Sequence, residues 1–262
     1  VYTYGNNVYV GGHDYYGEPG NNWGTATVWK NGEPIIQENP EGAVPYSRVN
    51  SIRVINNKVY AAGYYSPSFG SSRACVWVDG ILDASLLNES QKTDAKFIDI
   101  SEDGKMHILG SGQTSSVTKY WINGVSQSGY QFDNVYAKGL WVDGNDVHII
   151  GNVPGGGNDI SRYWKNGVLQ TLESASVRSI PLYDIYIRDG DVYITGHSLY
   201  IWKNGIRIDA GAYMKHIAVS EDGTIYSVKK VGSVPTLHVD NVPVDLTADG
   251  AGGEANDIFI VE

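Results

Sequence analysis

The 262-residue chain has one cysteine, two methionines and no long hydrophobic run. Cys75 cannot form an internal disulfide, and its place two residues before a Trp in a strand-like run predicts a packed thiol rather than a reactive one. No segment has the length and apolarity of a membrane helix, so we expect no membrane insertion of this segment. The N-terminal residues lack the pattern of a signal peptide, so the protein is either cytosolic or has lost its leader.

Positive charge is also scarce. The 19 Lys and Arg residues against 29 Asp and Glu residues give a net charge of −10, which repels a phosphate backbone and argues against nucleic acid as a partner. The sequence has no phosphate-cradling Gly-rich helix start, no His-Glu-x-x-His, no Cys-x-x-Cys and no Gly-x-Ser-x-Gly. We therefore expect no cofactor and no assigned metal or catalytic residue, and a noncatalytic protein is favoured over an enzyme.

Glycine and aromatic residues are abundant instead, with 32 Gly, 19 Tyr and 7 Trp, a composition that favours turns and strands over helices. A phrase that joins Trp to Asn-Gly or Asp-Gly recurs with gaps of 48, 44, 43 and 38 residues between successive Trp residues. The copies begin at Trp29, Trp77, Trp121, Trp164 and Trp202, and a degenerate sixth copy spans Leu237 to Asn241. A period of this length, built from short strands, is typical of propeller blades.

A second shared phrase, such as Val192-Tyr-Ile-Thr-Gly196, precedes each copy. The unit is therefore strand a, a tight turn, strand b, a loop, strand c ending on Tyr-Trp, and an Asn-Gly hairpin into strand d. Asn-Gly supplies the positive φ that such hairpins need, and each Trp is expected to fill the wedge between neighbouring blades.

These units predict an all-β fold, a single-domain six-bladed β-propeller with four antiparallel strands per blade. The approximate blades are 1–47, 48–94, 95–135, 136–181, 182–213 and 214–255. A closing strand is expected at 256–262, in which Ile258 to Val261 help to seal the ring against the first blade, because propellers commonly close by joining their two ends.

The Tyr-Trp-Lys-Asn-Gly and Val-Tyr-Ile-x-Gly phrases resemble those of β-propeller repeat proteins found among secreted or envelope proteins of Bacteroidetes, and more distantly those of WD-repeat and kelch blades. The similarity covers almost the whole chain. It departs from WD repeats in lacking their Trp-Asp and Gly-His dipeptides, and from kelch in lacking the Gly-Gly pair in most blades. The resemblance implies an architecture and a secreted or cell-envelope location, and says little about chemistry.

In this topology the a–b and c–d turns share one face and are short, whereas the b–c and d–a loops share the other face and are long. Long polar and aromatic loops on a rigid scaffold commonly carry function. Their amphipathic rings suit sugar faces or protein hot spots, although such loops can also pack on themselves. The predicted aromatic platform is Trp23, Tyr15, Tyr16, Tyr64 and Tyr65.

Lysines recur where strand a begins, nearest the expected central channel. Lys96, Lys138 and Lys215 align there with Asn50 and Tyr183, and Arg48 lies close by. These cations could orient a carboxylate or sulfate group of a ligand. The alternative is that lysines at strand ends are simply solvated.

The histidines fall into two groups. His107 and His148 replace the tyrosine of the strand b phrase and are predicted to pack between blades. His13, His197 and His216 lie at strand ends of blades one, five and six, so they could converge to hold a metal or act as acid-base groups. Scattered surface histidines are the alternative.

The leading hypothesis is a monomeric, noncatalytic binding module, secreted or displayed at the cell envelope, that engages a glycan or protein partner through its long loops. One alternative is a polysaccharide-acting enzyme that uses the His13, His197 and His216 sector. Another is a scaffold for a large protein partner, which would expose an apolar patch on the loop face.

Overall fold

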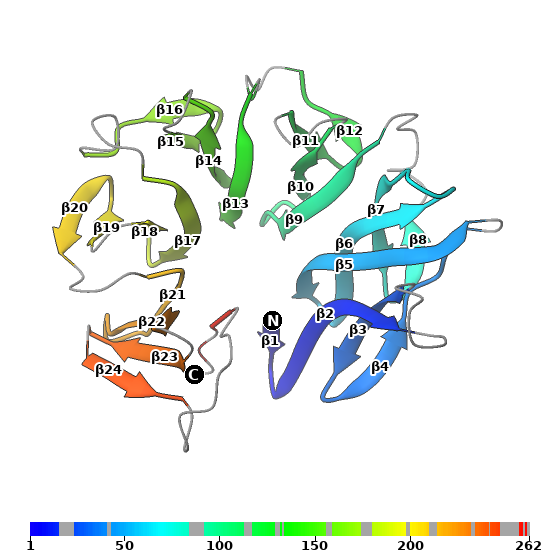
Figure 1. The fold of residues 1–262 in the computed structure, drawn as a ribbon, viewed down its shortest axis with the longest axis horizontal. Coiled ribbons are helices and arrows are strands. Elements are labelled where there is room, and N and C mark those ends of the chain that lie inside the picture. The colour runs from blue at the N-terminus through cyan, green and yellow to red at the C-terminus, as the bar shows by residue number, and fades with distance from the viewer. Residues whose placement is uncertain are drawn as a thin grey trace. The chain divides into compact units, whose positions relative to one another are not determined.

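A computed structural model describes most of the chain, and its described residues form strands and turns with no helix. The described residues are 1–15, 24–40, 43–83, 92–112, 117–128, 132, 134–155, 159–173, 180–197, 200–209, 214–231, 234–240, 242–246, 257–258 and 260. Within these ranges no helix could cross a membrane. The strands form six four-stranded antiparallel sheets, so the predicted fold class, a six-bladed β-propeller, is confirmed (Figure 1).

The chain divides into two compact units, and unit 1 (Val1–Tyr136) holds the first three blades. Blade one is β1 (Tyr2–Tyr4), β2 (Asn7–Tyr15), β3 (Gly24–Lys30) and β4 (Glu33–Ile36). Blade two is β5 (Val44–Ile55), β6 (Lys58–Ser66), β7 (Arg73–Val78) and β8 (Ile81–Asp83). Blade three is β9 (Asp94–Ile100), β10 (Met106–Ser111), β11 (Thr118–Ile122) and β12 (Val125–Ser126). Strand a of each later blade packs on the blade before it, β5 on β2 and β3, and β9 on β5, β6 and β7.

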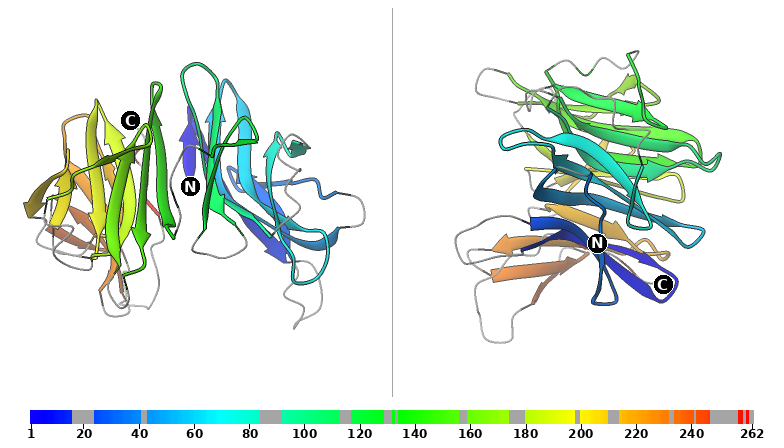
Figure 2. Two further views of the ribbon diagram at one scale, coloured as in Figure 1. Left: turned by 90° about the horizontal axis from the view of Figure 1, so that it is seen from above. Right: turned by 90° about the vertical axis from the view of Figure 1, so that its right-hand side faces the viewer.

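Unit 2 (Ala137–Glu262) holds the other three blades, built in the same way. Blade four is β13 (Tyr136–Asp143), β14 (Asp146–Val153), β15 (Ile160–Lys165) and β16 (Val168–Gln170). Blade five is β17 (Leu182–Arg188), β18 (Asp191–Gly196), β19 (Tyr200–Lys203) and β20 (Ile206–Asp209). Blade six is β21 (His216–Val219), β22 (Ile225–Val231), β23 (Val234–Val239) and β24 (Val242–Asp245). Figure 2 shows the antiparallel hairpins of each unit from two further sides.

Three of the repeated Trp residues lie where successive blades of one unit meet. Trp77 is fully buried with residues of blades one and two, and Trp202 is fully buried with residues of blades four and five. Trp121 packs likewise between blades two and three, whereas Trp29 in the first blade is half-buried. Burial of one indole stabilises the fold by about 4 to 6 kcal/mol before entropy is counted. The predicted wedge role is confirmed at Trp77, Trp121 and Trp202.

Two of these indoles are each anchored by a glutamate that follows the last strand of the preceding blade. Trp77 Nε1 donates to the Glu38 carbonyl at 2.6 Å, and Trp202 Nε1 donates to the Glu173 carbonyl at 2.8 Å. The Glu173 backbone N–H donates in turn to the Gly205 carbonyl, and its Oε2 accepts from the Arg207 N–H. Each glutamate therefore joins its blade to the next one through three hydrogen bonds, a role that sequence reasoning missed.

The Asn-Gly and Asp-Gly turns have the predicted positive φ, for example 52° at Asn204 and 80° at Gly205. They also form a pair of hydrogen bonds, here called the turn clasp, that sequence reasoning did not predict. The Asn204 N–H donates to the Val192 carbonyl, while the Asn204 Oδ1 accepts from the Val192 N–H, both at 2.8 Å. The same pair of bonds links the c–d turn to the start of strand b in all six blades. An Asn or Asp recurs at this position because both its conformation and its side chain are needed.

Other expectations have mixed outcomes. Cys75, His107 and His148 are buried, as predicted for packing residues. Of the expected closing strand, the structure describes Asp257, Ile258 and Ile260, none of which is in a strand. The sealing role of that segment, the blade boundaries and the single-domain extent stay predictions.

Candidate functional site

One side of β5 is exposed along the first half of the strand. Tyr46, Arg48 and Asn50 are exposed and alternate with buried Ser47 and Val49, following the period of two that a strand imposes. Arg48 lies directly opposite Tyr64 on β6 in the antiparallel register. Side chains at such opposed positions share a face of the sheet and can interact. Two aromatic residues and a guanidinium are therefore gathered on one face of blade two.

Each strand a in this region carries a β-bulge, at the position where the sequence aligned Asn50 with Lys96. The β5–β6 register passes from Val49 directly to Ser51, and the β9–β10 register passes from Phe97 directly to Ala95. Asn50 and Lys96 are the extra residues, and bulges of this kind re-aim a side chain, commonly beside a functional site. In unit 2, the β17–β18 register passes over Tyr183 in the same way.

The glycine that ends the strand b phrase makes room for the bulge. A Cβ at position 63 would lie 1.8 Å from the Arg48 carbonyl oxygen, and one at position 110 would lie 2.0 Å from the Asp94 carbonyl oxygen. Any other residue would push the two strands apart. The motif glycine is thus explained by a close backbone approach rather than by a turn.

Asn50 connects blades two and three through β9. Its Nδ2 donates to Asp94 Oδ1 at 2.7 Å and to the Ala95 carbonyl at 2.9 Å. Burial raises the pKa of the Asp94 carboxyl, while Lys96, the hydrogen bond from Asn50 and Arg48 oppose that rise. Two cations therefore affect Asp94 electrostatically, Lys96 from the same strand and Arg48 from β5.

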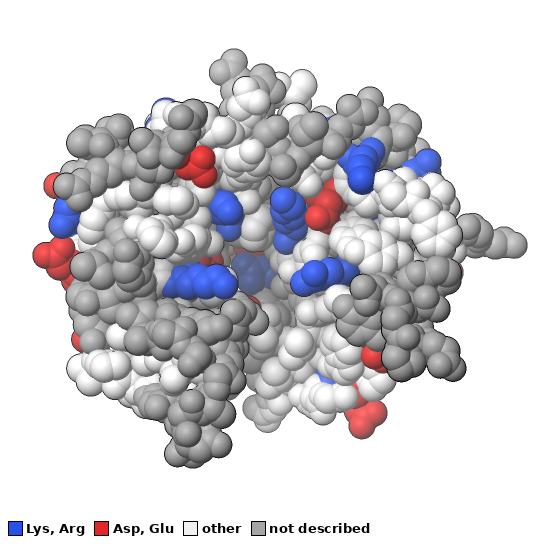
Figure 3. Space-filling model, viewed as in Figure 1, with Lys and Arg blue, Asp and Glu red and all other residues white. Residues whose placement is uncertain are grey.

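The two tyrosines form an aromatic pair. The rings of Tyr46 and Tyr64 have centroids 5.7 Å apart and planes tilted by 52°, and Tyr46 is 45% exposed. Burial, followed by the hydrogen bond with Tyr46, raises the pKa of Tyr64, so its hydroxyl keeps its proton at neutral pH. The residues Tyr46, Arg48, Asn50, Tyr64, Asp94 and Lys96 together form what we call the unit 1 site. In the space-filling view, Lys or Arg and Asp or Glu side chains lie next to each other over β5 and β9 (Figure 3).

The structure places some of the predicted platform residues differently. Tyr64 belongs to the unit 1 site, but the prediction that Tyr65 is an exposed platform residue is wrong, because Tyr65 is 4% exposed and packs in the core of blades one and two. The strand β6 continues to Ser66, so consecutive tyrosines must point to opposite faces. Tyr15 ends β2, where only its backbone is described, and Tyr16 and Trp23 lie outside the described residues.

The predicted cations are divided between the units. Arg48 and Lys96 belong to unit 1, whereas Lys138 on β13 and Lys215 just before β21 belong to unit 2. That all four cations together form one positively charged region near the expected channel stays a prediction. Tyr46 was not singled out from the sequence, although the alternation of Tyr46, Arg48 and Asn50 was a signal that could have found it.

The three candidate histidines have distinct surroundings. Partial burial and then Arg48 lower the pKa of His13 in blade one. In unit 2, His197 Nδ1 is 2.6 Å from the Tyr183 hydroxyl, and His216 Nδ1 is 3.5 Å from Asp184 Oδ2. Within the part of the chain that the structure describes, no group of three or more His, Cys, Asp or Glu side chains is arranged to hold a metal ion.

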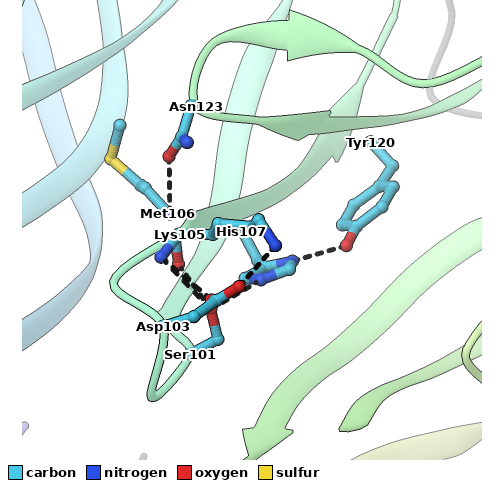
Figure 4. A network of polar contacts seen from close by, with 7 residues as sticks. All are labelled: Ser101, Asp103, Lys105, Met106, His107, Tyr120 and Asn123. Carbon is cyan, nitrogen blue, oxygen red and sulfur yellow. Dashed lines mark hydrogen bonds and ion pairs between the residues drawn. The ribbon is translucent and has the colours of Figure 1, made fainter. Parts of the chain in front are cut away.

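The contact between Ser101 and His107 in blade three supports a turn and does not form a nucleophile–base pair. Figure 4 shows Ser101, Asp103 and His107 pointing toward one another at the β9–β10 turn. Ser101 is buried, and its hydroxyl donates to Asp103 Oδ1 at 2.5 Å while lying 3.2 Å from His107 Nε2. A proton already directed at a carboxylate is not positioned for removal by the imidazole. Hydrogen bonds from Lys105 and Ser101 lower the pKa of Asp103 to about 2, as expected for a carboxylate that holds a turn.

Comparisons with known proteins give no family. No protein-family model matches the chain, and no curated protein matches it. Among solved structures, an exo-β-1,3-galactanase from Clostridium thermocellum is similar at 9% identity and a TM-score of 0.47, over 93% of this chain and 77% of the other.

Two further similar structures have comparable scores. An α-L-arabinofuranosidase from Clostridium thermocellum has 13% identity and a TM-score of 0.39, over 88% of this chain and 92% of the other. The β-propeller domain of the Trilobed protease from Pyrococcus furiosus has 14% identity and a TM-score of 0.36, over 95% of each chain. At these identities and scores, none of the three assigns an activity or a residue to this chain.

Proposed function

We propose that this protein is a noncatalytic module that binds a carbohydrate at the unit 1 site, and that it works in a secreted or envelope-attached form. The observation that carries the proposal is the partly exposed Tyr46 ring, which lies against Tyr64 with Arg48 opposite Tyr64 on the adjoining strand. Aromatic rings offer an apolar face with a polar edge, and sugar rings present C–H groups on one face with hydroxyls around the edge.

The polar groups around the rings suit the same kind of ligand. Arg48 and Lys96 can donate to hydroxyl or acidic oxygens, and Asp94 and the tyrosine hydroxyls can exchange hydrogen bonds with sugar hydroxyls. These side chains are carried by β5, β6 and β9, whose backbones are fixed by sheet pairing. A site on strands loses little conformational entropy when a ligand binds.

A screen of immobilised polysaccharides, followed by titration calorimetry, tests the proposal. Tyr46→Ala is expected to weaken carbohydrate binding about tenfold without changing the melting temperature, because the ring is partly exposed. Tyr226→Ala in unit 2 is the matched control and should bind like the wild type. Equal affinity of Tyr46→Ala and wild type, or no carbohydrate bound at all, would reject this proposal and favour a protein partner.

A second candidate function, action on a polysaccharide as an enzyme, has one observation in its favour. Burial raises the pKa of Asp184 beside His216, and a general acid near neutral pH needs such a shift. However, the Asp184 oxygens accept hydrogen bonds from the Ile185 and Ile217 N–H groups, which gives the carboxylate a role in joining blades five and six. Loss of turnover in Asp184→Asn without loss of stability would favour the enzyme.

A further inference from the structure

We propose that the carbohydrate bound at the unit 1 site carries a carboxylate or sulfate group, which Arg48 and Lys96 bind together. This inference rests on the proposed function, because it names the ligand class of the same site. Carboxylates and sulfates share the relevant chemistry, namely a compact group of negatively charged oxygens.

The local charge is opposite to that of the whole protein. The chain has a net charge of −10, yet the unit 1 site holds two cations, Arg48 and Lys96, against one carboxylate, Asp94. A surplus positive charge on an acidic protein attracts an anionic ligand to that place and disfavours contact elsewhere. Arg48 is exposed, and its planar guanidinium can donate two parallel hydrogen bonds to a carboxylate or sulfate.

The backbone directs both cations toward the same place. β9 packs on β5, and the hydrogen bond from Asn50 to Asp94 fixes the two strands at this point. Lys96 is the bulged residue of β9, so its side chain departs from the alternation of the strand. Lys96 and Arg48 both lower the pKa of Asp94 against the effect of its burial, in keeping with two cations that reach this point from blades two and three.

Asp94 lowers the affinity of this site for an anion. Its Oδ1 accepts from Asn50, and its negative charge neutralises part of the field of Arg48 and Lys96. Asp94→Asn keeps an oxygen that can accept from Asn50 and removes only the charge. This variant should therefore bind an acidic carbohydrate more tightly than the wild type does, by about three- to fivefold, the range of an exposed charge pair.

The test compares ligands that differ only in charge. Polygalacturonate is titrated against its carboxyl-reduced form, and dextran sulfate against dextran, so the first pair tests a carboxylate and the second a sulfate. Binding of the charged member alone in at least one pair is expected. For that ligand, Arg48→Ala should weaken binding tenfold or more, since it removes hydrogen bonds to a charged group, and Lys96→Ala should weaken it about three- to fivefold.

Lys58→Ala is the matched control, because Lys58 begins β6, at the far end of the strand from Tyr64, and should leave affinity unchanged. The inference is overturned if the neutral polymers bind as tightly as the charged ones, if the tightest ligand of the screen is neutral, or if Arg48→Ala and Lys96→Ala bind like Lys58→Ala. In those cases carbohydrate binding itself stands. If no carbohydrate binds, the proposed function fails, and this inference fails with it.

Discussion

Arg53 of β5 holds Asp99 of β9 with two parallel hydrogen bonds, Nε to Oδ1 at 2.7 Å and Nη2 to Oδ2 at 2.8 Å. The side chains are 18% and 7% exposed, so this bidentate pair joins blades two and three with little access to solvent. Arg53→Met leaves the Asp99 carboxylate buried without its guanidinium, and should lower the free energy of unfolding by about 3 to 5 kcal/mol.

Urea denaturation of the full chain, in which unit 2 is unchanged, measures this effect. Arg207→Met serves as the control, because its partner Asp209 is 85% exposed, and exposed pairs contribute about 1 kcal/mol or less. Equal losses in the two variants would contradict the assigned role of the Arg53–Asp99 pair.

Two variants of Asn204 in the turn clasp separate the contribution of the turn conformation to stability from that of the side-chain hydrogen bond. Asn204→Gly keeps the positive φ and removes the side-chain acceptor of the Val192 N–H, so it should cost about 1 kcal/mol. Asn204→Ala removes the same acceptor but keeps a Cβ in the left-handed region, which Gly lacks and Asn offsets by local hydrogen bonding, so it should cost about 1 to 2 kcal/mol more than Asn204→Gly. Chemical denaturation of the two variants measures the difference, and equal stabilities would show that the turn relaxes to another conformation.

The pH dependence of stability should carry a contribution from His148. Burial, with a smaller effect of Lys165, lowers the pKa of His148 from 6.5 to about 4. Between those values the unfolded chain binds more protons than the folded one, so stability rises with pH through this window and is lost as pH falls below 6.5.

Denaturation midpoints measured from pH 7 down to pH 4 test this sign. One group contributes a slope of at most about 1.4 kcal/mol per pH unit. His148→Gln should be less stable at neutral pH but should show a shallower loss in acid. A wild-type slope retained in the variant would assign the acid sensitivity to other groups.

Gly63 should tolerate no side chain. A Cβ there would lie 1.8 Å from the Arg48 carbonyl oxygen, so Gly63→Ala should lower the free energy of unfolding by about 3 kcal/mol and weaken ligand binding by displacing Arg48. Gly70→Ala is the control, since its φ of +75° is strained but its surroundings are open, and it should cost about 1 to 2 kcal/mol. Thermal unfolding and calorimetry read out both effects.

The features that sequence reasoning found are local ones. The strands and turns around each Trp, the positive φ of Asn31 and its equivalents, and the burial of His107 follow from short motifs whose residues are close together in the chain. Tyr65 was predicted to be exposed because the sequence does not show that β6 continues to Ser66. Within a strand, only one of two adjacent tyrosines can face the core. The Asn50–Asp94 and Arg53–Asp99 contacts depend on how separate blades meet, and no period in the sequence encodes them.

The bulge at Lys96 also affects how the protein could be redesigned. Because this residue lies outside the pairing register of β9 and β10, exchanging its side chain leaves every paired position of the two strands unchanged. Asn50 holds the same kind of position in the preceding blade, but its hydrogen bonds to β9 connect two blades, so Lys96 is the position to exchange. New specificities could therefore be installed by rewriting single side chains on an unaltered scaffold, and the demands of recognition and of folding would fall on different residues.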